Sequence, residues 1–127
     1  MRVLIADDDR MVASVLAEMV RNHGHEVTGI ARSGLEAIRF YNQSAPDVVL
    51  MDFAMSTLNG ATASRMIMSQ HPEARIVMVS GYLSREDLSQ MECGAMVGIP
   101  KPLRVERLNT ILDEMERRIW KIRHDVN

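Results

Sequence analysis

The feature of this 127-residue sequence that most constrains its fold is a set of short apolar runs that recur along the chain. The runs, each of strand length, are Val3–Ala6, Val27–Ile30, Val48–Met51, Ile76–Val79 and Ala95–Ile99. Segments with helical spacing separate them, and in the first segment Val12, Leu16 and Met19 share one face. A chain that alternates strands and helices in this way is typical of a parallel sheet covered by helices.

The order of the strands follows from which runs are apolar throughout. The first, third and fourth runs are continuously apolar, as strands buried on both faces of a sheet are. The second run contains Thr28 and Gly29 and the fifth contains Gly98, which favours positions at the two edges. We therefore predict a flavodoxin-like, doubly wound (βα)5 fold with a parallel five-stranded sheet in the order 2-1-3-4-5. Its topological switch point lies between the first and third strands.

Turn and capping residues support these boundaries within one domain spanning residues 1–127. Gly24 stands where a helix C-terminal cap is expected, and Ser33 and Glu36 have the spacing of a capping box. Pro72 should end the third helix, and the fourth should begin at Ser84. The last helix is predicted to be long, from about residue 104 to residue 123, because its apolar residues keep a helical spacing to the C-terminal end.

Charge and cysteine content exclude several classes of function. The chain has 15 basic and 17 acidic residues, a net charge of -2, so no broad cationic surface is available for nucleic acid. The single cysteine excludes an internal disulfide and a cysteine-based zinc site. The sequence has no apolar stretch long enough for a membrane span. We expect a cytoplasmic domain that binds neither membrane nor nucleic acid directly.

Polar residues gather where the predicted strands end. Asp7–Asp9 follow the first strand, Asp52 the third, Ser80 the fourth and Lys101 the fifth. Ligands bind at this edge of a doubly wound sheet, near the switch point. Clustered carboxylates repel one another unless a cation binds, and an oxygen-rich, incomplete cage suits Mg²⁺. Asp9 is set apart from the others, because it is also expected to cap the helix that begins at Arg10. A carboxylate can carry a phosphoryl group, which makes Asp52 the candidate nucleophile.

The same elements resemble the receiver domain of two-component response regulators, in particular the chemotaxis regulators. The resemblance covers nearly the whole chain, and every motif stands in the family's order and at its intervals. The matching segments are Leu4–Asp9, Val49–Met55, Asn59–Gly60, Val77–Gly81, Gly94–Ala95 and Lys101–Pro102.

The resemblance implies a phosphoacceptor. Asp52 would accept a phosphoryl group from a phosphohistidine of a sensor kinase or a histidine phosphotransfer protein. Mg²⁺, or Mn²⁺, would be bound by Asp8, Asp52 and the main-chain carbonyl of Ala54, with Asp7 acting through water. The domain would catalyse its own phosphorylation and dephosphorylation without being an enzyme of a separate class, and phosphorylation would switch a partner-binding surface.

Two further side chains complete the site that the resemblance implies. Three positions depart from the family's pattern: Gly98, Ser56 and Pro100, the last an unusual neighbour of Lys101. Lys101 would pair with a phosphoryl oxygen, and the Ser80 hydroxyl would donate a hydrogen bond to another. Gly98 stands where receivers usually carry an aromatic switch residue, and Ser56 where proline is common. These departures affect the output step, in which phosphorylation changes the surface that binds a partner.

Two other functions are consistent with parts of the pattern. A phosphohydrolase of the haloacid dehalogenase type also places a nucleophilic aspartate after a strand, but it needs an acid two residues later, where this chain has Ala54. The second alternative is a receiver-shaped module that binds partners without phosphorylation, which Gly98 and Ser56 favour.

Residues away from the strand ends are expected to play structural or interaction roles. The apolar stripe of the last helix continues past the sheet through Ile119, Trp120 and Ile122, and these residues are expected to pair with a second copy of the chain or with a partner helix. The histidines are interpreted as solvated surface residues because no pair has the helical spacing of metal ligands. They are His23, His25, His71 and His124.

Overall fold

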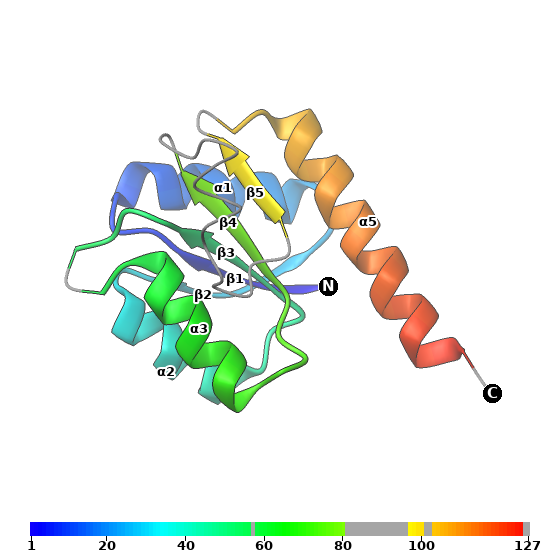
Figure 1. Ribbon diagram of the computed structural model, residues 1–127. Helices are drawn as coiled ribbons and strands as arrows, with labels where there is room; N and C mark the ends of the chain where they lie inside the picture. Colours follow the sequence, from blue (N-terminus) through cyan, green and yellow to red (C-terminus); the bar gives the residue numbers. More distant parts are fainter. Residues whose placement is uncertain (57, 81–96, 101–102, 126–127) are drawn as a thin grey trace.

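The computed structural model describes residues 1–56, 58–80, 97–100 and 103–125. Five parallel strands form one sheet in the order β2-β1-β3-β4-β5 (Figure 1), as predicted from the sequence. The strands are β1 (Arg2–Ala6), β2 (Glu26–Ala31), β3 (Val48–Asp52), β4 (Ile76–Ser80) and β5 (Val97–Pro100). The helices are α1 (Arg10–Asn22), α2 (Gly34–Ser44), α3 (Gly60–Gln70) and α5 (Val105–His124). The fourth helix predicted from Ser84 lies outside the described residues.

Helices cover both faces of the sheet and create two cores. In β1, Val3 and Ile5 pack with α1 and α5, whereas Leu4 and Ala6 pack with α2 and α3. This alternation is the period of two that side chains follow along a strand. Figure 1 shows α2 and α3 together on one side of the sheet and α1 on the other. The central strands are buried on both faces, which explains why their sequences are apolar throughout.

Capping side chains fix the starts of the helices that follow β1 and β2. The Asp9 carboxylate accepts the main-chain N–H groups of Met11 at 2.9 Å and Val12 at 3.2 Å, which confirms its predicted role. The Ser33 hydroxyl accepts the Glu36 amide at 3.1 Å. Glu36 reaches back to the Arg32 amide at 2.9 Å instead of the Ser33 amide. The capping box therefore closes one residue earlier than its usual form.

The long helix α5 begins and ends within one residue of the predicted bounds. Its inward face is buried through Ile119, so the prediction that Ile119 pairs with a partner is wrong, because its side chain packs in the core. Trp120 and Ile122 are 62% and 66% exposed. In Figure 1 its C-terminal turns extend beyond the sheet. An ion pair between Arg123 and Asp47, with 2.9 Å between nitrogen and oxygen, ties this end to the residue before β3. Among the described residues, no helix has the length and apolar character needed to cross a membrane.

One prediction about the histidines is wrong. His25 is 8% exposed, so it is a buried residue and not a solvated one. It lies between α1 and β2, in a turn that Gly24 makes with a positive φ of 86°. Burial lowers the pKa of the His25 imidazole, with the amino group of Met1 acting in the same direction.

Candidate functional site

Three aspartates meet at the carboxyl edge of the sheet. Asp52 is the last residue of β3, and Asp7 and Asp8 follow β1. The two strands are neighbours, with Ala6 opposite Met51, so their ends lie side by side. One carboxylate oxygen from each aspartate lies within 4.8 Å of the others. Asp7 and Asp52 are 1% and 5% exposed, and Asp8 is open to solvent.

Main-chain contacts hold the two residues after β1 in place. The Asp7 amide donates to the Ala31 carbonyl at 2.9 Å, which continues the pairing of β1 with β2 past the end of the strand. The Asp7 carboxylate accepts the Asp9 amide at 2.9 Å. The Asp8 carboxylate accepts the Ser56 amide at 3.4 Å, a contact that connects it to the loop after β3. The cluster is thus supported from β2, from α1 and from the β3–α3 loop.

The start of α3 is pressed against the main chain of Asp52. Asn59 caps α3 by accepting the Thr62 amide at 2.8 Å, and the Gly60 amide donates to the Phe53 carbonyl at 2.8 Å. A Cβ atom at Gly60 would collide with the carbonyl oxygen of Asp52. Glycine is therefore required at this position by close approach of two main chains. The sequence identified Asn59–Gly60 as a matching motif but not this supporting role.

Of the three other predicted site residues, the structure describes Ala54 and the main chain of Ser80. Ala54 is exposed in the loop directly after Phe53, and its carbonyl remains a predicted ligand. Ser80 is the last residue of β4 and pairs with Pro100 of β5, so its main chain reaches the same edge as Asp52. Lys101 lies outside the described residues. Gly98, where an aromatic residue was expected from the family, is opposite Met78 in the sheet.

The donors at the edge fit a hard divalent cation. Mg²⁺ prefers carboxylate and carbonyl oxygens, keeps several waters, and is commonly held by one or two carboxylates together with phosphate oxygens. Two buried carboxylates and one exposed carboxylate within 4.8 Å provide such an incomplete set. The exposed position of Asp8 leaves an open side for solvent and for a phosphoryl group.

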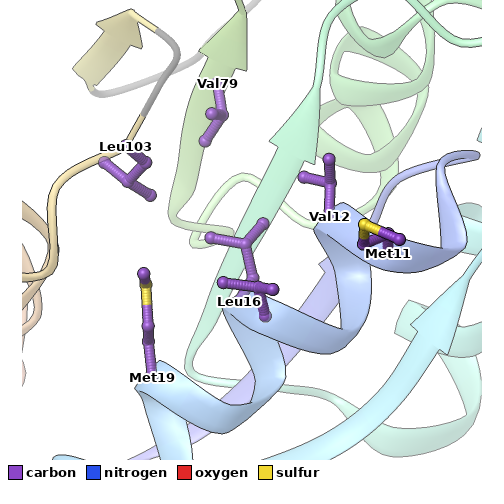
Figure 2. Close-up of a pocket in the computed structure, with 7 residues that line it drawn as sticks. Met11, Val12, Leu16, Met19, Val79 and Leu103 are labelled. Carbon is purple, nitrogen blue, oxygen red and sulfur yellow. The ribbon is translucent and has the colours of Figure 1, made fainter.

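An apolar pocket of about 440 Å³ lies along α1, close to the acidic cluster. Figure 2 shows Leu16 and Met19 of α1 on one side of the hollow and Leu103 and Val79 on the other. At its margin Met11 and Val15 are 77% and 45% exposed. The helical spacing of the sequence predicted an apolar face here, but not that its outer part stays open. The pocket is lined by Met11, Val12, Val15, Leu16, Met19, Val79 and Leu103.

The family model of the response regulator receiver domain matches residues 3–113. The chain belongs to this receiver family. It is 32% identical over 117 residues to the chemotaxis protein CheY of Thermotoga maritima, covering 91% of this chain and 98% of that protein. It is 35% identical to protein-glutamate methylesterase/protein-glutamine glutaminase 3 of Hahella chejuensis, covering 80% of this chain but only 30% of that longer protein.

Solved structures agree with this assignment. The response regulator domain of Thermotoga maritima CheB superimposes on this receiver with a TM-score of 0.79 and 29% identity, covering 92% and 94% of the two chains. A receiver domain from Clostridium thermocellum superimposes with a TM-score of 0.86 at 22% identity, a likeness of fold. The predicted family and flavodoxin-like fold are confirmed, and the chain is a receiver domain of two-component signal transduction.

Proposed function

We propose that Asp52 is the phosphoacceptor of this receiver and takes its phosphoryl group from a phosphohistidine of a sensor kinase or phosphotransfer protein. The observation that carries the proposal is the position of its carboxylate, buried at the end of β3 and clustered with those of Asp7 and Asp8. This cluster lies at the switch point of the sheet, where doubly wound folds bind their ligands.

The transfer requires little from the protein beyond position and charge. A carboxylate oxygen of Asp52 attacks the phosphorus atom, the phosphorus–nitrogen bond breaks, and its electron pair stays on the imidazole, which takes up a proton. Asp7, Asp8, Asp52 and the Ala54 carbonyl are the residues that would hold Mg²⁺ or Mn²⁺. Such an ion supplies positive charge for the phosphoryl oxygens.

Two side chains are proposed to complete the site: Ser80 at the end of the fourth strand and Lys101 after the fifth. The Lys101 ammonium would pair with one phosphoryl oxygen and the Ser80 hydroxyl would donate to another, both favouring the charge of the transferring group. Hydrolysis of the aspartyl phosphate by water in the same site would return the domain to its resting state. The two phosphorylation states would differ in the surface offered to a partner.

The apolar pocket along α1 is the surface that we propose the phosphodonor covers. Met11 stands two residues after Asp9, whose amide contacts Asp7, so the rim of the pocket adjoins the acidic cluster. A protein that brings a phosphohistidine to Asp52 must pack on the surface beside it. Exposed apolar side chains such as Met11 and Val15 suit an apolar helix of the donor.

Incubation with acetyl phosphate and Mg²⁺, followed by intact-mass measurement, tests the phosphoacceptor. The wild-type chain should gain one phosphoryl group, Asp52→Asn should gain none, and the control Asp125→Asn should behave as wild type. Labelling of both the wild type and Asp52→Asn, or of neither, contradicts the proposal. Absence of labelling in the wild type is the result expected of a module that acts without phosphorylation.

A turnover assay on a phosphomonoester distinguishes the proposed phosphoacceptor from a phosphohydrolase of the haloacid dehalogenase type. Ala54 provides no general acid at the position where haloacid dehalogenases carry one. We therefore expect no sustained release of phosphate from p-nitrophenyl phosphate, and sustained turnover would favour the hydrolase.

A further inference from the structure

A second cluster of metal-ligating side chains lies away from the phosphorylation edge. His23 is the C-cap residue of α1, His25 precedes β2, and Asp113 is on α5. One ligand atom from each of the three lies within 4.8 Å of the others. The helix α1 runs from the Asp9 cap to His23, a length of roughly 20 Å at the usual rise of an α-helix. The two clusters therefore lie at opposite ends of α1.

The contacts within this cluster are close. Nε2 of His23 lies 2.7 Å from Oδ1 of Asp113. The rings of His23 and His25 meet edge to face, with centroids 5.5 Å apart. The cluster thus joins the turn after α1 to the middle of α5, two segments about 90 residues apart in sequence.

The His25 ring has one nitrogen in contact and one without a partner. Nδ1 lies 2.9 Å from the amino group of Met1 and 3.9 Å from Oε2 of Glu116. Within the described part of the chain, Nε2 is buried and makes no hydrogen bond. A buried polar atom without a partner costs free energy, and an explanation is needed for each one in a native protein. The side chain is 4% exposed, so solvent does not compensate.

We propose that His23, His25 and Asp113 bind a divalent transition metal ion of the Zn²⁺ class. Two imidazoles and one carboxylate, with water in the fourth position, form a common ligand set for this ion. Ligand atoms around tetrahedral Zn²⁺ are roughly 3.3 Å apart, given bonds of about 2.0–2.1 Å. The 2.7 Å contact of His23 with Asp113 has to open slightly, and the other ligand atoms, which already lie within 4.8 Å of one another, have to settle near this spacing. His23 and Asp113 are partly exposed and can make these adjustments by rotating their side chains.

Glu116 supports the assignment from one turn further along α5. Its carboxylate faces Nδ1 of His25, the nitrogen opposite the one that lacks a partner. A metal can bind Nε2 only when Nδ1 carries the ring proton, so the Met1 amino group, 2.9 Å from Nδ1, has to move aside and the Glu116 carboxylate, 3.9 Å away, has to approach and accept that proton's hydrogen bond. Metal bound at Nε2 would give that atom its partner and would fix α5 to the α1–β2 turn.

Calorimetric titration with ZnCl₂ tests the site in a buffer without phosphate. The wild-type chain is first saturated with Mg²⁺, so that the acidic cluster does not compete for Zn²⁺. We expect one equivalent of Zn²⁺ to bind and the melting temperature to rise. His23→Ala and Asp113→Asn should each weaken binding by at least about tenfold, because even outer-shell substitutions at metal sites have effects of that size. His71→Ala and His124→Ala are the matched controls and should bind as the parent does.

Replacement of Zn²⁺ by Co²⁺ gives a readout that a purely structural ion pair would not produce. The parent chain should develop the visible absorption of a tetrahedral Co²⁺ site, and His23→Ala should lose it. Absence of Zn²⁺ binding overturns the proposal, as does binding that survives both His23→Ala and Asp113→Asn. Loss of binding in a control variant overturns it as well, since the ion would then lie elsewhere. None of these outcomes depends on phosphorylation of Asp52.

Discussion

Gly60 lies so close to Asp52 that a single methyl group at position 60 would collide with the carbonyl oxygen of Asp52. The residue after the cap of α3 therefore sets the main-chain position of the proposed phosphoacceptor. A hydrogen bond from the Gly60 amide to the Phe53 carbonyl strengthens this contact. Packing at the start of α3 and the chemistry at the end of β3 are thus coupled through the main chain.

The substitution Gly60→Ala should destabilise the receiver and slow its phosphorylation. Inserting a methyl group where two main chains touch forces them apart, at a cost of about 1–3 kcal/mol. Urea denaturation measures the loss of stability, and acetyl phosphate labelling followed over time measures the rate.

Gly29→Ala is the matched control for this substitution. A Cβ at Gly29 would meet the Phe40 ring at 3.4 Å, an ordinary contact distance, and its φ is not in the left-handed region. Its effect on stability should therefore be smaller than that of Gly60→Ala, and its labelling rate should be that of the wild type. Equal effects of the two substitutions would contradict the coupling of Gly60 to Asp52.

Asp8→Asn should stabilise the metal-free receiver and reduce its response to Mg²⁺. Asp8 shares a cluster with two other carboxylates, and removing one charge relieves their repulsion. Because Asp8 is exposed, we expect a gain of about 0.5–1 kcal/mol without Mg²⁺. Thermal unfolding with increasing MgCl₂ checks this, and the wild-type melting temperature should rise more than that of the variant. An equal Mg²⁺ response in both chains would mean that Asp8 does not contribute to the metal site.

Much of the fold could be predicted because its determinants are local in sequence. Continuous apolar runs mark the central strands, and Thr28 and Gly29 mark an edge. Asp9 and Ser33 cap helices through contacts within three residues. The convergence of Asp7, Asp8 and Asp52 followed from the strand order alone, because parallel strands end at a common edge.

The features that sequence reasoning missed depend on contacts between distant segments. The burial of His25 follows from α5 packing near the turn between α1 and β2, which no local spacing reveals. Val15 and Leu16 both line the pocket along α1, yet only Leu16 is covered by the core. The requirement for glycine at position 60 arises from the path of the main chain, which residue types do not encode.

The stability of the receiver should depend on the ionisation of Asp47 at acidic pH. Burial alone would raise the pKa of Asp47, but hydrogen bonds from the Arg2 amide and the Arg123 guanidinium outweigh burial and lower it. A lowered pKa means that the folded state favours the ionised form. The ionised Asp47 therefore makes its full contribution to the free energy of unfolding at pH values well above its unfolded pKa of 3.8. This contribution is lost as the pH falls through the pKa of the folded state.

Asp47→Asn tests this dependence. At pH 7 the variant should be less stable by about 1 kcal/mol, because two hydrogen bonds to a carboxylate are weakened. The difference between wild type and variant should shrink below about pH 5 and vanish under strongly acidic conditions. Urea denaturation from pH 7 to pH 3 measures both curves, with Asp125→Asn as the exposed control. A constant difference across this range would exclude ionisation of Asp47 as the cause.

In the last turns of α5, substitutions of buried residues should destabilise the fold, whereas substitutions of exposed residues should affect only the binding of a partner. Ile119 is buried in the core, whereas Trp120 and Ile122 are exposed. Ile119→Ala should lower the free energy of unfolding by about 2–5 kcal/mol, and Ile122→Ser should change it by no more than about 0.5 kcal/mol. Sedimentation before and after phosphorylation then tests the dimer expected through this surface. A dimer that Ile122→Ser converts to monomer would support that expectation, and a wild-type monomer in both states would remove it.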